Sequence, residues 1–275
     1  MVVVDLSFDR SSEQCGDHRA SIREAYNKKM KWWNEKRDTG ARCRVCWLTE
    51  QHCFCSTIAE RRALYKKIDN VNVCIYYHYR EFGRCINTAH FFQAISPTNT
   101  DVIVFGDAER EQRLVQDIKD EHDADDCVTC ILYPNASAVP LSEWMAKKTS
   151  NKPVRLIALD GTYKDAREQL KHLENSMKRI DPSVALPIVK LDLPQERCVS
   201  AFAGIINQPG KCLISTYQAL VMALEQAGAD RAICASLGTE IEPWMLHILK
   251  SGIKKAGSKL NAESPFESVR EFLKN

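Results

Sequence analysis

The chain has 275 residues, of which 44% are hydrophobic and 27% charged, a composition that suits one or two folded domains and excludes global disorder. No apolar run approaches the ~18 residues of a membrane helix, so we expect no membrane span. The N-terminus lacks the features of a secretory signal. With 12 cysteines, this predicts an intracellular protein, cytoplasmic or nuclear, whose thiols are reduced or bind metal.

The net charge of +2 is unevenly distributed. Residues 19–67 carry 13 basic and 5 acidic side chains and include Trp32, Trp33, Trp47 and Tyr65, whereas residues 101–126 carry 3 basic and 10 acidic side chains. The acidic stretch is typical of a solvated helix face. The basic stretch is either another solvated face or, because of its aromatic residues, a surface that binds a polyanion.

The first predicted helix covers residues 21–37, and Gly40 follows it as a stop signal. A cysteine-rich loop comes next, and a second helix is predicted over 57–68. The loop places four thiols within 13 residues, at Cys43, Cys46, Cys53 and Cys55. Closely spaced cysteine pairs are typical of a closed, tetrahedral structural zinc site, with four unliganded surface thiols as the alternative.

From residue 71 onward, strands alternate with helices. Strands are predicted at 71–77, 102–105, 128–132, 154–159 and 184–191, and helices at 87–95, 109–119, 141–148, 163–180, 215–227 and 240–255. This alternation predicts an α/β fold, with a mainly parallel sheet covered by helices on both faces. We place a domain boundary near Asp69, which gives an N-terminal basic, zinc-binding segment (1–68) and an α/β domain (69–275).

Glycine spacing excludes two common nucleotide sites. No two glycines are two residues apart, so a Gly-x-Gly-x-x-Gly loop is absent, and Gly210-Lys211 is followed by Cys212, not by the Ser or Thr of a phosphate-binding loop. A nucleotide-like cofactor would therefore need another kind of loop.

The most informative turn follows the predicted strand 154–159 and reads Asp160-Gly161-Thr162-Tyr163. Asp160 stands at the carboxyl end of that strand, where open α/β sheets bind ligands. The alternative interpretation is that Asp160 or Thr162 caps the helix beginning near Tyr163.

The stretch from Asp160 to Arg167 resembles the Asp-x-Thr-Trp motif, with trailing Ala-Arg, that names the DTW-domain family. The cysteine loop resembles the head of the same family, and further similar stretches follow in the family's order. They are His78-Tyr79-Arg80-Glu81, Asn87-Thr88-Ala89, Leu132-Tyr133-Pro134 and Ile214-Ser215-Thr216-Tyr217-Gln218-Ala219. The chain differs from the family pattern at Tyr79 (Pro), Asn87 (Gly), Tyr163 (Trp) and Gln218 (Glu), and it lacks an Arg near Gly204.

This resemblance implies a tRNA-uridine aminocarboxypropyltransferase, which moves the 3-amino-3-carboxypropyl group of S-adenosylmethionine (SAM) to N3 of a tRNA uridine. It also implies a SPOUT-like fold with a knotted C-terminal half. The alternatives are a non-catalytic RNA-binding module on the same fold and a SPOUT-like RNA methyltransferase. The expected partner is tRNA, and nothing in the sequence indicates an obligate protein partner.

Asp160 is the candidate base that activates or orients uridine N3–H. Tyr163 is the candidate aromatic that stacks on the splayed-out base, with helix packing as its alternative role. His78 is either a core residue or an active one. The expected walls of the SAM site are Tyr133, Pro134, Asn135, Leu159, Gly161, Thr162, Ser215 and Thr216, although the hydroxyls of the last two would serve equally well as helix caps.

The basic segment supplies the candidate RNA contacts Arg42, Arg44, Arg61, Arg62 and Lys66. Arg80 and Arg84 are further candidates, for phosphates or for the SAM carboxylate.

Overall fold

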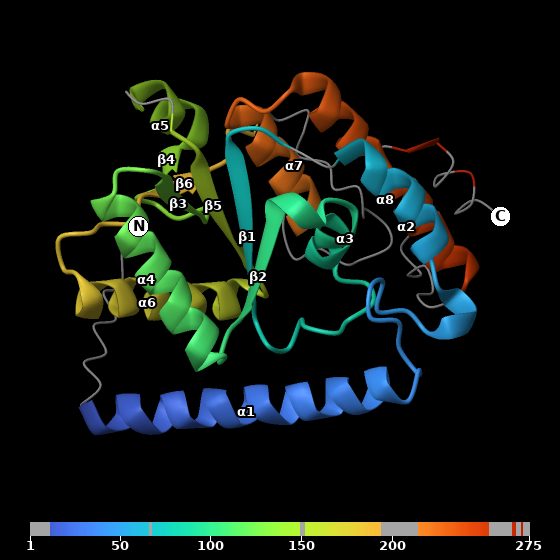
Figure 1. Cartoon of the computed structure of the whole chain (residues 1–275), viewed down its shortest axis with the longest axis horizontal. Helices are drawn as coiled ribbons and strands as arrows, with labels where there is room; N and C mark the ends of the chain where they lie inside the picture. The colour runs from blue at the N-terminus through green and yellow to red at the C-terminus, as the bar shows by residue number, and fades with distance from the viewer. Residues whose placement is uncertain are drawn as a thin grey trace, which may run out of the picture.

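The computed structural model describes residues 12–65, 68–148, 152–193, 214–252, 266–267 and 271. Within these ranges a six-stranded, all-parallel sheet runs through the centre of the molecule, in the order β2-β1-β5-β3-β6-β4 (Figure 1). The strands are β1 (Val71–Tyr77), β2 (Thr100–Val104), β3 (Val128–Leu132), β4 (Val139–Pro140), β5 (Val154–Asp160) and β6 (Ile188–Lys190). The predicted α/β class and parallel sheet are therefore confirmed.

Helices cover both faces of the sheet. They are α1 (Ser12–Asp38), α2 (Cys55–Arg62), α3 (Thr88–Ile95), α4 (Ala108–Asp123), α5 (Leu141–Lys147), α6 (Tyr163–Ile180), α7 (Thr216–Gln226) and α8 (Arg231–Lys250). One core cluster packs α3, α7 and α8 against alternate residues of β1 such as Val73 and Ile75, and the other packs α4 and α6 against Cys74 and Tyr76. Because both faces are buried, β5 is apolar along nearly its whole length.

Several predicted boundaries hold, and others shift for local reasons. β1, β3 and α6 have the predicted bounds, whereas α1 begins earlier than predicted. Helix α8 also begins earlier, because the Asp230 side chain accepts hydrogen bonds from the amides of Ala232 and Ile233 and caps its start. Strand β6 is shorter than predicted, since Val184 is buried without joining the strand.

The N-terminal segment shares a core with the α/β body. Trp33, Trp47 and Leu48 belong to the same buried cluster as Val71 and Val154. The domain division at residue 68 stays a prediction. The link between β6 and α7 lies outside the described residues, and so the knotted, SPOUT-like C-terminal half also stays a prediction.

Neighbouring strands β1 and β5 form the topological switch point of the sheet. The connection after β1 leads outward to β2, whereas the connection after β5 leads towards β6 on the opposite side. In open α/β sheets, ligands bind outside the carboxyl ends of two such strands.

Helix α1 runs along this same carboxyl edge (Figure 1). Gly106, just after β2, has a φ of +101°, and a Cβ there would stand 2.7 Å from Cβ of Tyr26. Gly83, in the loop after β1, has a φ of +77° and would place a Cβ 2.8 Å from Cε3 of Trp33. Glycine thus permits both the left-handed backbone and the close approach of the helix.

Candidate functional site

Asp160, the last residue of β5, lies at the switch point and is only 4% exposed. Both of its carboxylate oxygens accept a hydrogen bond. The Asn87 side-chain amide donates to Oδ2 at 2.6 Å, and the Thr216 hydroxyl donates to Oδ1 at 2.7 Å. Since Asn87 precedes α3 and Thr216 begins α7, Asp160 joins the starts of two helices to the end of a strand.

Burial raises the pKa of Asp160 to about 6. The hydrogen bonds from Asn87 and Thr216 act in the opposite direction, because they stabilise the ionised form. Glu81 adds to the rise, and Arg84 opposes it. A carboxyl group that titrates this close to neutrality is better suited to proton transfer at physiological pH than an ordinary Asp.

The N-termini of α3, α6 and α7 all belong to this site. Their capping side chains are Asn87, Thr162 and Ser215, each of which accepts a hydrogen bond from a backbone amide in the first turn of its helix. Helix N-termini carry partial positive charge and unpaired amides, so they favour anionic groups. The capping roles considered for Thr162 and Ser215 are therefore confirmed, and they do not conflict with a place in the site wall.

The turn after Asp160 forms an exposed rim beside the buried carboxyl group. Gly161, Thr162 and Tyr163 are exposed, and the Tyr163 side chain is 47% exposed. A Cβ on Gly161 would stand 3.0 Å from Cβ of Asp165 and 3.2 Å from Cβ of His78. The close packing of this turn therefore requires a residue without a side chain.

The loop after β3 borders the same rim. Tyr133 is buried, and its backbone amide donates a hydrogen bond to the carbonyl of Val189. The pKa of Tyr163 is raised, mainly by its own burial and to a smaller extent by the nearby Tyr133. Pro134 is exposed, whereas Asn135 and Leu159 are half-buried. The residues predicted for the cofactor wall thus come from the ends of β3 and β5 and the start of α7.

Two of the departures from the family pattern have structural explanations. Asn87 both caps α3 and donates to Asp160, and a glycine has no side chain for either task. Gln218 accepts hydrogen bonds from the amide and hydroxyl of Ser215 and completes a capping box, as a Glu would.

His78 is a buried histidine that directly follows β1, at the carboxyl edge of the sheet. Its backbone amide donates to the carbonyl of Asp160 at 2.8 Å, and its Nε2 lies 3.6 Å from Oδ1 of Asp165. Burial lowers its pKa, although the charge of Asp165 opposes this. The His78 side chain is only 1% exposed, and the backbone amide of this residue links the end of β1 to the end of β5.

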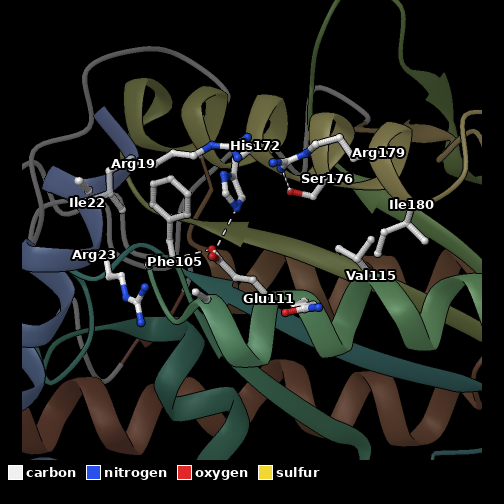
Figure 2. Close-up of a pocket in the computed structure, with 14 residues that line it drawn as sticks. Arg19, Ile22, Arg23, Phe105, Glu111, Val115, His172, Ser176, Arg179 and Ile180 are labelled. Atoms are coloured by element: carbon white, nitrogen blue, oxygen red, sulfur yellow. Dashed lines mark hydrogen bonds and ion pairs between the residues drawn. The ribbon is translucent and has the colours of Figure 1, made fainter. Parts of the chain in front are cut away.

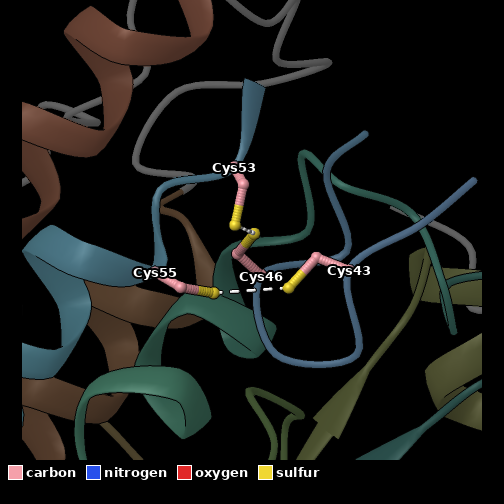
Figure 3. A group of neighbouring side chains, drawn as sticks. All are labelled: Cys43, Cys46, Cys53 and Cys55. Carbon is pink, nitrogen blue, oxygen red and sulfur yellow. Dashed lines mark hydrogen bonds between the residues drawn. The ribbon is translucent and has the colours of Figure 1, made fainter. Parts of the chain in front are cut away.

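The four loop cysteines converge as predicted (Figure 3). Their Sγ atoms all lie within 4.8 Å of one another, with 3.3 Å between Cys43 and Cys55 and 3.7 Å between Cys46 and Cys53. Four thiolates around Zn²⁺ at about 2.3 Å lie about this far apart, so the cluster can hold a zinc ion. Burial opposes ionisation of Cys43, but hydrogen bonds from backbone amides and neighbouring thiols lower its pKa to about 7.

The cysteine loop is attached directly to α3. His90 of α3 contacts the carbonyl of Val45 through Nε2 at 2.7 Å, and its ring stacks on Trp47 with centroids 3.4 Å apart. Trp47 has a φ of +61°, an unusual conformation for a bulky residue that is held by this packing. The cysteine loop therefore supports the helix whose N-terminus contacts Asp160.

A family model for the DTW domain matches residues 40–252, which is more than half of the chain and includes the cysteine loop, Asp160 and α7. The chain belongs to the DTW-domain family. This family is associated with tRNA modification. No solved structure matches the chain.

The described arginines predicted to contact RNA each contact another group of this DTW protein, although several remain partly exposed. Arg61 pairs with Glu240 at 3.2 Å, and Arg62 donates to the carbonyl of Ala94. The others that contact a carbonyl or carboxylate are Arg42 with Trp47, Arg44 with Asp38, Arg80 with Asp165 and Arg84 with Glu81. Lys66 lies outside the described residues. Their role in RNA binding stays a prediction.

A cavity of about 530 Å³ lies between α1, α4 and α6 (Figure 2). None of the DTW-site residues predicted from sequence lines it. Its buried Glu111 already accepts hydrogen bonds from the Tyr76 hydroxyl and the Gly106 amide and pairs with His172 at 3.3 Å. The polar groups at its base are thus satisfied by one another.

Among the residues that the structure describes, no helix is both long enough and apolar enough to span a membrane.

Proposed function

We propose that this chain transfers the 3-amino-3-carboxypropyl group of SAM to N3 of a tRNA uridine. One observation carries the proposal. The buried Asp160 carboxyl group, with a pKa of about 6, lies beside the exposed Tyr163 at the sheet's switch point, within a DTW domain. The site thus combines a group able to take a proton with an aromatic surface able to receive a base.

The residues around Asp160 fit SAM chemically. The N-termini of α6 and α7 suit the carboxylate of SAM. Tyr133 and Tyr163 offer aromatic surface for an adenine. Two buried oxygens in this region, Tyr77 Oη and Gln169 Oε1, have no hydrogen-bond partner among the described residues and offer further polar contacts.

When bound, SAM would supply the electrophilic γ-carbon of its methionine part, whose bond to the sulfonium would break as uridine N3 bonds to that carbon, with neutral methylthioadenosine as the leaving group. Asp160 accepts the N3 proton of uridine, which makes that nitrogen nucleophilic. Asn87 and Thr216 hold the carboxylate in one orientation while it does so. Tyr163 stacks on the uracil ring after it has left the RNA stack.

We further propose that the cysteine cluster binds a structural Zn²⁺. Its four thiols fill a tetrahedral shell and leave no open position for a reacting group. Its role is to hold the loop that packs on His90 and so to fix α3 beside Asp160.

A labelling experiment tests the proposed reaction. The full chain is incubated with unmodified tRNA and with SAM labelled either in the aminocarboxypropyl chain or in the methyl group. We expect chain label, and not methyl label, to become attached to a uridine. Methyl label on the RNA would indicate a methyltransferase, and tRNA binding without either label would indicate a non-catalytic RNA-binding module.

The rate of transfer should depend on pH through Asp160. Below a pH of about 6 this carboxyl group is protonated and cannot accept the N3 proton, so the rate constant should fall about tenfold per pH unit. Above it, the rate should level off. Burial sets this pKa, against the hydrogen bonds from Asn87 and Thr216, and the charges of Glu81 and Arg84 have smaller and opposite effects. A single-turnover pH–rate profile that stays flat from pH 5 to 8 would contradict the assignment.

A further inference from the structure

Helix α1 presents a basic and aromatic strip towards solvent. Lys28, Trp32 and Lys36 follow one another at four-residue spacing and therefore lie on one face of the helix. Lys29 flanks Trp32 on the same side, and Arg84 of the loop after β1 lies near Lys29. We call these five residues the α1 strip.

Trp32 is the aromatic centre of the strip. Its side chain is 36% exposed, and Nζ of Lys29 lies 4.3 Å from the centroid of its ring. Its neighbour Trp33 is buried, 4% exposed, and anchors the helix in the core. An exposed indole beside lysines offers both a stacking surface and positive charge, which is how proteins bind single-stranded nucleic acid.

The loop of residues 78–87 joins the strip to the candidate active site. Gly83 packs against both tryptophans, since a Cβ there would lie 2.8 Å from Trp33 and 3.4 Å from Trp32. The loop then carries Arg84 and ends at Asn87, which donates to Asp160. The strip and Asp160 therefore lie at the same edge of the sheet, and Arg84 is three residues from Asn87, which contacts Asp160.

The charges of the strip are only partly compensated. Burial and then the charge of Arg84 lower the pKa of Lys29, while Glu81 opposes this. Glu81 is itself paired with Arg84 at 2.6 Å, so these three groups together carry +1. Lys28 and Lys36 are exposed and add further positive charge, which Glu24, one turn before Lys28 in the same row, and the exposed Glu35 partly offset. A polyanion would relieve the repulsion among the cations.

We propose that the α1 strip binds the tRNA, with lysines on its phosphates and an unpaired base stacked on Trp32, next to the uridine that reaches Asp160. This rests on the proposed function for its choice of RNA as substrate. Apart from Arg84, it differs from the sequence-based candidates, because the other described arginines among them already contact a carbonyl or carboxylate of this chain, whereas Lys28 and Lys36 are exposed.

The test measures tRNA binding by the full chain, using fluorescence anisotropy over a range of salt concentrations. The triple variant Lys28→Glu, Lys29→Glu, Lys36→Glu should bind unmodified tRNA at least about tenfold more weakly, and its salt dependence should fall by about 2 in log–log slope. Trp32→Ala should weaken binding about tenfold without changing the slope, and Trp32→Phe should restore most of the affinity.

A matched control reverses three exposed lysines elsewhere, with Lys171→Glu, Lys178→Glu and Lys250→Glu on α6 and α8. This control should bind within twofold of the unaltered chain, and thermal melting should show all variants folded. Equal losses in the control and strip variants, or a strip variant with unchanged affinity and slope, would overturn the proposal. So would loss of binding in Trp32→Phe equal to that in Trp32→Ala.

The outcomes separate this inference from the proposed function. If tRNA binding depends on the strip but no label is transferred, only the proposed transferase activity is contradicted. If the strip variants transfer label normally and bind tRNA with unchanged affinity, only the proposed role of the α1 strip in tRNA binding is contradicted.

Discussion

Replacing Asp160 with Asn is expected to slow transfer by about 10²–10⁴-fold, the usual loss when a general base is removed. The substitution keeps the size of the side chain. Its Oδ1 can still accept from Asn87, and its amide can donate to the Thr216 hydroxyl, which can turn to accept. Because burial disfavours the charge of Asp160, removing that charge should not destabilise the fold.

The measurement is single-turnover transfer with tRNA and SAM saturating, alongside calorimetric SAM affinity and the free energy of unfolding. Asp165→Asn provides the matched control. It removes a nearby carboxylate that caps α6 and pairs with Arg80, so it should cost about 1 kcal/mol of stability and little of the rate. If Asp160→Asn instead transferred at a rate within a few-fold of the unaltered chain, Asp160 would be a structural residue. Lost SAM affinity would reassign it to cofactor binding.

Replacing Cys46 with Ser is expected to lower the free energy of unfolding by roughly 4 kcal/mol or more, a size typical of losing a metal site. Cys46 is buried, 2% exposed, and its Sγ is one of the four that converge. Without the metal, the loop no longer holds Trp47 and Val45 against His90, so α3 should loosen beside Asp160. Transfer should therefore fall together with stability.

Elemental analysis of the unaltered chain should find about one zinc per chain, and denaturant unfolding with and without a chelator should reproduce the loss of stability. Cys74→Ser is the matched control, because Cys74 is equally buried but lies in β1, in the other core cluster. It should keep the zinc and lose about 1 kcal/mol. A metal-free chain that is fully folded and active would contradict the assignment.

Local sequence patterns predicted much of this fold. Short runs rich in β-branched and aromatic residues identify β1 and β3 to the residue, because such side chains are favoured in strands. The spacing of the cysteines predicts their convergence, since four ligands within one short loop need little help from the rest of the chain. Asp160 could be singled out because it ends a buried strand and begins the family's motif.

Local sequence patterns could not predict the contacts between residues that are distant in sequence. The hydrogen bonds of Asn87 and Thr216 to Asp160 span 73 and 56 residues, and the packing of the sheet and three helices creates them. An Asn just before a helix is a recognisable capping signal, but its second bond is not.

The same limit explains the basic residues. By sequence, Arg61 and Lys29 are equivalent positive charges in one basic segment. The fold pairs Arg61 with the buried Glu240 of α8 and places Lys29 over the ring of Trp32. The sequence by itself determined which elements form and which residues are chemically able to act. Only the tertiary structure decided which charged side chains pair with another group of the protein and which lie near the edge that carries Asp160. Burial and pairing depend on spatial neighbours, and chain order does not specify these.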